Sequence, residues 1–249
     1  MARFTRDDDL REAQFTGVDL RGARVVDSYL NDAVLRGVDV DRVEVDAPWL
    51  TEEGGSLVVN GVDVAPYVDA ELDRRFAGRS LRHSCDPDGL RRAWAAVERQ
   101  WAATVERATS LPPGAVEESV GGEWSLSQTL RHLVMATDLW FGATVLGLEQ
   151  PFHPVGLPNA EAEDDGLDLT AFSSPDPSFD EVLAARAGRL GMVRDYLASV
   201  TSDQLAGVRR NPWAPDREET VLRCLQGILH EEWEHHRYAV RDLALLRSA

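Results

Sequence analysis

Apolar side chains recur every five residues along the N-terminal segment of the chain. The repeating apolar positions are Leu10, Phe15, Leu20, Val25, Leu30, Leu35, Val40 and Val45. A small or β-branched residue stands two places before most of them, at Ala13, Val18, Ala23, Ser28, Ala33, Val38 and Val43. A period of five matches neither the 3.6-residue period of a helix nor the two-residue period of a strand, so this segment predicts a repeat architecture.

This pattern resembles the pentapeptide-repeat family. The resemblance implies a short right-handed four-sided β-helix, in which the repeated apolar residues stack inside and four pentapeptides make one coil. Residues 8–47 would then give about two coils, which is too short for the long acidic rods that imitate DNA. We therefore expect residues 1–47 to be a packing or interaction element that needs a cap.

The next segment alternates apolar and polar residues around a turn. Asn60 and Gly61 stand between the two halves of 57–64, and this dipeptide is a strong signal for a β-hairpin. Pro66 then starts a short helical pattern whose charged residues predict a solvated face. We interpret 48–85 as a connector.

Helical periodicity begins after the connector, within a predicted third part that spans 86–249. The four expected helices cover residues 86–108, 125–146, 178–200 and 218–247. Asp86 before Pro87 is a helix cap, and Ser125 with Gln128 forms a capping box. Four helices separated by breaks predict a helix bundle, so the chain as a whole is expected to be α+β.

Composition excludes several classes of function. The net charge is −17, and such an acidic protein repels phosphate backbones and anionic lipids, so we expect neither nucleic acid nor membrane as a partner. The N-terminus lacks the apolar core of a signal peptide, which favours a cytoplasmic location. Two cysteines far apart, Cys85 and Cys224, make no disulfide framework, and Cys224 is expected in the core.

The last helix carries the densest cluster of chemically active side chains. Residues 230–237 read His-Glu-Glu-Trp-Glu-His-His-Arg, and three Glu/His pairs there are spaced i,i+4, so each pair shares one helix face. Against the apolar stripe of this helix, Glu232 and His236 fall near the middle, and Glu231 and His235 lie on one edge. His230 and Glu234 are expected to face solvent.

His132 lies on the edge of the stripe of the second helix, displaced in the same rotational sense as Glu231 and His235. This agreement favours convergence of the three side chains in a groove beside the core. Three protein ligands with an open position are typical of a catalytic metal. Imidazole and carboxylate ligands suit zinc first, with nickel or iron as alternatives. The alternative is that these are ordinary helix-surface partners.

Two short motifs are similar to the DinB-like superfamily, which includes mycothiol-dependent isomerases and bacillithiol or mycothiol S-transferases. The motifs are Glu123-Trp124-Ser125 followed by Arg131-His132-Leu133, and residues 231–243. The resemblance covers about residues 86–247 and implies an antiparallel four-helix bundle that binds a metal through one His on the second helix and a His-x-x-x-His pair on the fourth. Here Glu231 replaces the first His of that pair.

Three hypotheses follow for the function. The first is a metal-dependent enzyme that uses a low-molecular-weight thiol, mycothiol-like by resemblance, against a small electrophile. In this hypothesis Glu232 or His236 would shuttle a proton. Arg237 or Arg241 would bind a substrate carboxylate, or would form a structural salt bridge with Asp242. The second is a metal-dependent hydrolase with the same ligands. The third is a non-catalytic interaction protein, for which a homodimer through the coil ends would fit.

Overall fold

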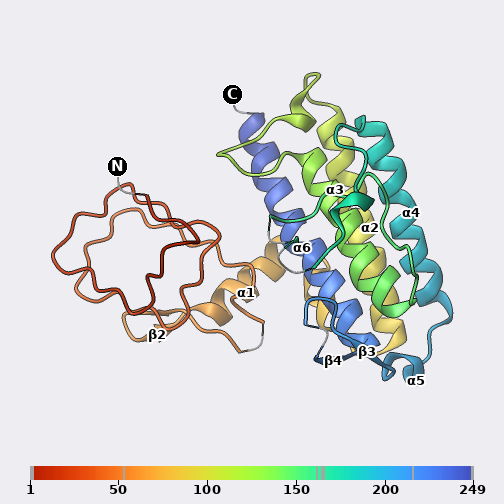
Figure 1. Cartoon of the computed structure of the whole chain (residues 1–249), viewed down its shortest axis with the longest axis horizontal. Helices are drawn as coiled ribbons and strands as arrows, with labels where there is room; N and C mark the ends of the chain where they lie inside the picture. The colour runs from red at the N-terminus through yellow and green to blue at the C-terminus, as the bar shows by residue number, and fades with distance from the viewer. Residues whose placement is uncertain (1–2, 53, 161, 164–165, 215, 248–249) are drawn as a thin grey trace. The chain divides into compact units, whose positions relative to one another are not determined.

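The computed structural model of the chain describes residues 3–52, 54–160, 162–163, 166–214 and 216–247. The chain divides into two compact units, Met1–Asp46 and Ala47–Ala249, which are described separately. Among the described residues the molecule is mostly helical, and its only strands form two short antiparallel pairs (Figure 1).

The N-terminal unit winds in successive loops (Figure 1), and its backbone turns at a regular interval of five residues. A left-handed backbone conformation recurs at Glu12, Gly17, Gly22, Asp27, Asp32 and Gly37, with φ between 47° and 75°. Glycine adopts this conformation without strain, and Asp does so more readily than most residues. The sequence period of five is therefore a period of the backbone.

The apolar positions of this unit are more exposed than the expected stacking implies. Leu10 is 43% exposed, and the other seven repeating positions are more exposed still, up to 70% at Leu35. The described residues thus show the repeat but no closed apolar interior. A short repeat array offers each side chain few neighbours, since such an array buries its core between adjacent repeats.

The second unit begins with a hairpin and a short helix. Strands β1 (Val58–Val59) and β2 (Val62–Asp63) form the predicted hairpin, with Val59 opposite Val62. Asn60 and Gly61 both have positive φ, as the two-residue turn requires. Helix α1 (Ala65–Arg75) follows with proline in its first turn, and the short 3₁₀ helix η1 (Arg79–His83) comes next.

Four long helices build the rest of this unit. They are α2 (Pro87–Thr109), α3 (Leu126–Thr137), α4 (Phe179–Ser199) and α6 (Val221–Leu246). The predicted caps are confirmed: the Gly89 amide donates to Asp86, and both halves of the Ser125–Gln128 capping box are present. Each capping group satisfies a backbone N–H that the helix itself leaves unpaired.

Each of these helices packs against two others in a closed ring, α2 with α6, α6 with α3, α3 with α4, and α4 with α2. One apolar core fills the space between them. Its largest members are Trp94, Trp101, Trp233 and Phe141. Cys224 also lies in this core as predicted, and burial raises the pKa of its thiol to about 11.

The predicted second helix changes geometry halfway. After Thr137 the chain continues as a π-helical segment, η3 (Asp138–Val145), rather than as α-helix to residue 146. The start of the predicted fourth helix was also wrong, because residues 218–220 form strand β4 (Glu218–Thr220), paired with β3 (Val208–Arg210).

Short helices complete the second unit. They are η2 (Ala115–Glu117), η4 (Leu169–Ala171) and α5 (Ser202–Leu205). Within the described part of the chain, no helix combines the length and apolar character that a membrane span requires.

Candidate metal centre

Three side chains from two helices converge beside the core. His132 of α3 lies with Glu231 and His235 of α6, and one ligand atom from each can be chosen so that all lie within 4.8 Å of one another. The Glu231 carboxylate is 3.2 Å from Nε2 of His235 and 3.7 Å from Nε2 of His132. These are the three residues that the sequence places on matching helix edges, and we call them the triad.

The tautomer of His132 suits metal binding. Its Nδ1 lies 3.3 Å from the carbonyl oxygen of Leu157, and a carbonyl can only accept, so Nδ1 carries the proton. The other ring nitrogen, Nε2, faces the Glu231 carboxylate at 3.7 Å. A histidine ligand oriented through a backbone carbonyl on its other nitrogen is the usual arrangement in metal sites.

Arg131 fastens the segment that supplies this carbonyl. Its guanidinium donates to the carbonyl oxygens of Val155, Ser174 and Pro175 at 2.9–3.1 Å, and its own carbonyl accepts from the Leu157 amide at 3.2 Å. The Arg-His dipeptide therefore has two structural roles, because Arg131 positions the loop that in turn orients His132. The sequence alone gave no role to Arg131.

Aromatic rings border the triad. The Trp124 ring lies 4.7 Å from that of His132 and stacks on that of His235 at 6.1 Å, and Tyr238 meets the edge of His235 at 5.9 Å. The side chains of Glu231 and His235 retain 16% exposure and that of His132 10%. The triad is thus largely shielded yet still reached by solvent.

The electrostatics of the triad favour an ionised carboxylate at Glu231. Burial opposes ionisation of Glu231, but the interactions with His132 and His235 outweigh it and hold the pKa of that carboxyl well below its usual range. Burial lowers the pKa of His235, although Glu231 acts in the opposite direction. Deprotonated nitrogen and oxygen ligands are the forms that bind a divalent cation.

Glu232 and His236 lie deeper in the helix ring, as their place in the middle of the stripe predicts. Glu232 is fully buried and accepts a hydrogen bond from Arg186 of α4, and burial raises the pKa of its carboxyl. Nε2 of His236 lies 2.9 Å from Thr104 Oγ1, and burial lowers the pKa of this imidazole to about 4. Neither residue belongs to the cluster of possible ligands.

The expectation that His230 and Glu234 face solvent was wrong, since both are buried. His230 stacks on Trp49 with ring centroids 4.2 Å apart and pairs with Glu52 at 3.2 Å. Glu234 lies 3.5 Å from the buried guanidinium of Arg79 in η1. The segment interpreted as a connector therefore packs on the face of α6 that helix geometry alone leaves uncovered.

Arg237 and Arg241, the predicted carboxylate-binding residues, have partners on α6 itself. Arg237 bonds Glu234 at 2.9 Å, and Arg241 bonds Asp242 at 2.7 Å. Both guanidinium groups also lie over the Tyr238 ring, at 4.4 and 5.2 Å from its centroid. The predicted structural salt bridge between Arg241 and Asp242 is present.

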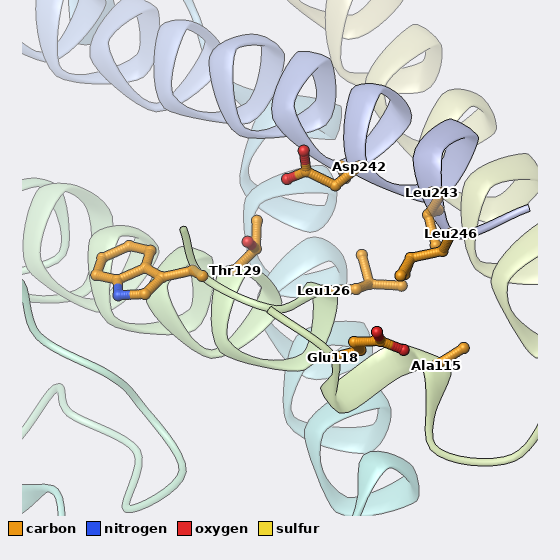
Figure 2. Close-up of a pocket in the computed structure, with 9 residues that line it drawn as sticks. Ala115, Glu118, Leu126, Thr129, Asp242, Leu243 and Leu246 are labelled. Carbon is orange, nitrogen blue, oxygen red and sulfur yellow. The ribbon is translucent and has the colours of Figure 1, made fainter. Parts of the chain in front are cut away.

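A narrow crevice lies beside Trp124. Its lining residues are Ala115, Glu118, Trp124, Leu126, Thr129, Ala239, Asp242, Leu243 and Leu246 (Figure 2). Figure 2 shows apolar side chains at the end of α6 together with the carboxylates of Glu118 and Asp242. Because Trp124 borders both this crevice and the triad, the two features are neighbours.

Comparison with known families agrees with both parts of the sequence. Eight copies of the pentapeptide repeat match residues 9–43. The DinB superfamily matches residues 96–239, a span that includes every member of the triad. No curated protein and no solved structure gives a significant match. Since the match at 96–239 extends over more than half of the sequence, the chain belongs to the DinB superfamily.

Proposed function

We propose that the protein is a metal-dependent enzyme of the DinB type, with His132, Glu231 and His235 as the metal ligands. The observation that carries the proposal is the convergence of these three side chains from two helices. The donor set fits a divalent cation, because two imidazole nitrogens and one carboxylate leave further coordination positions free. Zinc is the first expectation, ahead of nickel or iron.

The fold that accompanies this proposal is the antiparallel four-helix bundle implied by the superfamily, with a short right-handed β-helix before it. The closed ring of α2, α6, α3 and α4 supports the bundle. The left-handed backbone conformation that recurs at every fifth residue from Glu12 to Gly37 supports the β-helix, since it would mark the corners of the coils.

The proposed reaction transfers a low-molecular-weight thiol, mycothiol-like by family, to a small electrophile in the cytoplasm. A bound cation would lower the pKa of the thiol and favour the nucleophilic thiolate. Trp124 and Tyr238 provide apolar surfaces beside the triad.

Proton transfer by Glu232 or His236 has less support from the geometry. Glu232 is fully buried against Arg186, and His236 is buried against Thr104. Carboxylate binding by Arg237 or Arg241 would have to compete with Glu234 and Asp242. The proposal therefore depends first on the three metal ligands and on the aromatic surfaces of Trp124 and Tyr238.

The test is metal content, measured on protein purified without chelator and again after each divalent ion is supplied. We expect about one ion per chain in the wild type and a large loss in His132→Ala and His235→Ala. His83→Ala is the matched control, because His83 lies in η1 outside the triad. Absence of bound metal under all conditions would contradict every enzymatic proposal and favour an interaction protein.

A hydrolase with the same ligands is the second candidate, supported by the same open donor set. The two reactions differ in their requirement for a thiol. Turnover of electrophiles only when a thiol is supplied supports the transferase, whereas thiol-independent cleavage of esters or amides supports the hydrolase.

A further inference from the structure

A second cleft, of about 360 Å³, lies along one face of α4. It is lined by His153, Val155, Glu181, Ala184, Ala185, Gly188 and Arg189. The volume lies within the range of small-ligand sites. None of the triad residues borders it, so any ligand it takes is bound separately from the metal centre.

A buried carboxylate fixes the cationic side of this cleft. Asp138, fully buried at the start of the π-helical segment η3, accepts from Arg189 Nε at 2.7 Å and from Nη2 at 3.1 Å. Nη2 also lies 3.3 Å from the carbonyl oxygen of Pro151. Within the described residues this leaves the two N–H groups of Nη1 without a protein acceptor. The guanidinium is thus rigid and still has donors to offer.

His153 supplies a further donor from the opposite wall. Its backbone amide donates to the same Asp138 carboxylate at 2.8 Å, and its Nδ1 accepts from the Val155 amide at 3.2 Å. Because Nδ1 is an acceptor, the proton of the neutral ring resides on Nε2. Burial together with the nearby Arg189 lowers the pKa of this imidazole, so it is neutral near pH 7. Its ring therefore presents an N–H.

The floor of the cleft is small and largely apolar. Ala184, Ala185, Gly188 and Arg189 follow Glu181 by three, four, seven and eight residues. These spacings place all five residues on one face of α4. Glu181 closes the far end, where its carboxylate is held by Ser178. Two helical turns separate it from Arg189, a length of about 12 Å.

Charge limits the ligand to a weak anion. The guanidinium charge of Arg189 is already balanced by Asp138, and Glu181 adds a negative charge at the other end. The remaining negative charge repels any anion, and it repels a dianion such as phosphate more than a monoanion. A single carboxylate can offset the smaller repulsion through hydrogen bonds from oriented donors.

We propose that this cleft binds a small monocarboxylate with a short aliphatic chain. Its carboxylate would accept from Nη1 of Arg189 and Nε2 of His153, and its chain would lie over Ala184, Ala185 and Gly188. The metal centre has no part in this binding.

Titration of butyrate into ¹⁵N-labelled full-length protein tests the site. We expect saturable chemical-shift changes at Gly188 and His153, with no comparable effect of butyramide or inorganic phosphate. Arg189→Lys, which keeps a cation beside Asp138 but removes the guanidinium donors, should weaken binding about tenfold or more.

Two glycines of α4 give a variant that fills the cleft and a matched control. A Cβ added at Gly188 meets no atom within 4 Å, so Gly188→Leu can enter the cleft without a clash at its base. Gly191 lies outside the cleft, and its added Cβ meets only the end of the Arg194 side chain at 3.4 Å. Gly188→Leu should abolish butyrate binding, and Gly191→Leu should leave it unchanged.

Three results would overturn the proposal. The first is no saturation up to about 20 mM butyrate, the weak end of measurable affinity. The second is equal binding by Gly188→Leu and wild type, and the third is phosphate binding as tight as that of butyrate. Repeating the titration with His132→Ala separates the two sites, since loss of the metal centre should not change butyrate affinity.

Discussion

Arg186 of α4 donates a hydrogen bond to Glu232 of α6 across the interior of the helix ring, where both residues are at most 3% exposed. Glu232 directly precedes Trp233 of the core and directly follows Glu231 of the triad. Successive helical residues are rotated by about 100°, so holding Glu232 inward turns Glu231 towards His132. This buried pair therefore fixes the rotation of α6 that assembles the triad.

Removing one partner of this pair should be strongly destabilising. Arg186→Met leaves the Glu232 carboxylate buried without its cation, and we expect a loss of about 3–5 kcal/mol in the free energy of unfolding. Adding Glu232→Gln should recover part of that loss, because the uncompensated charge disappears. Urea unfolding measures both.

The control for these two variants is a more exposed salt bridge, which joins α4 to α2. Arg194 bonds Glu98 at 2.6 Å, with 59% and 23% exposure of the two side chains. Arg194→Met should cost less than about 1 kcal/mol. Equal losses at the two arginines would contradict a special role for the buried pair.

Stability should fall in mild acid through His236. Burial lowers the pKa of this imidazole from 6.5 to about 4, so between these values the unfolded chain binds the proton and the folded protein does not. Stability is therefore lost as the pH falls through this window, by about 2 kcal/mol from pH 7 to pH 5. His236→Gln should lose this part of the pH dependence. Parallel stability curves for the two proteins would refute the assignment.

Gly78 should be intolerant of a side chain. It joins α1 to η1 with φ of 97°, and an added Cβ would lie 2.6 Å from Cβ of Ala96 in α2. Gly78→Ala combines backbone strain with this clash, so we expect a loss of about 2–3 kcal/mol in unfolding experiments. Gly114→Ala is the control, because Gly114 has φ of 91° but its Cβ would meet nothing within 4 Å. Gly114→Ala should lower the free energy of unfolding by only about 1 kcal/mol.

The helices and their caps could be predicted because their signals are local. The Asp86 cap and the Ser125–Gln128 capping box depend on residues within one turn, and the structure has both. The change to π-helix at Asp138 depends on packing that lies elsewhere in the chain. Asp138 is buried against Arg189, fifty-one residues away, and helical periodicity carries no trace of that contact.

The triad could be predicted because two independent helix faces gave the same rotational sense. His132, Glu231 and His235 required only the stripe of each helix, and the structure brings them together. His230 was misplaced because its cover, Trp49, belongs to a segment without helical periodicity. A single helix shows which residues share a face, but not which distant loop packs on it.

Metal binding should stabilise the folded protein through Glu231 in particular. A ligand present at about 100 times its dissociation constant adds about 2.7 kcal/mol to the free energy of unfolding, because only the folded chain assembles the triad. For a unit of this size that corresponds to about 5–10 °C in the unfolding midpoint. Glu231→Ala removes the carboxylate that lies between the two imidazoles, so the shift caused by zinc should disappear.

Glu106→Ala, at an exposed position of α2, should retain the full shift. Glu231→His puts an imidazole ligand at the same position, giving the His-x-x-x-His pair that the superfamily resemblance implies, and should also retain the shift. A zinc-induced shift in Glu231→Ala equal to that of the wild type would mean that the ion binds outside the triad.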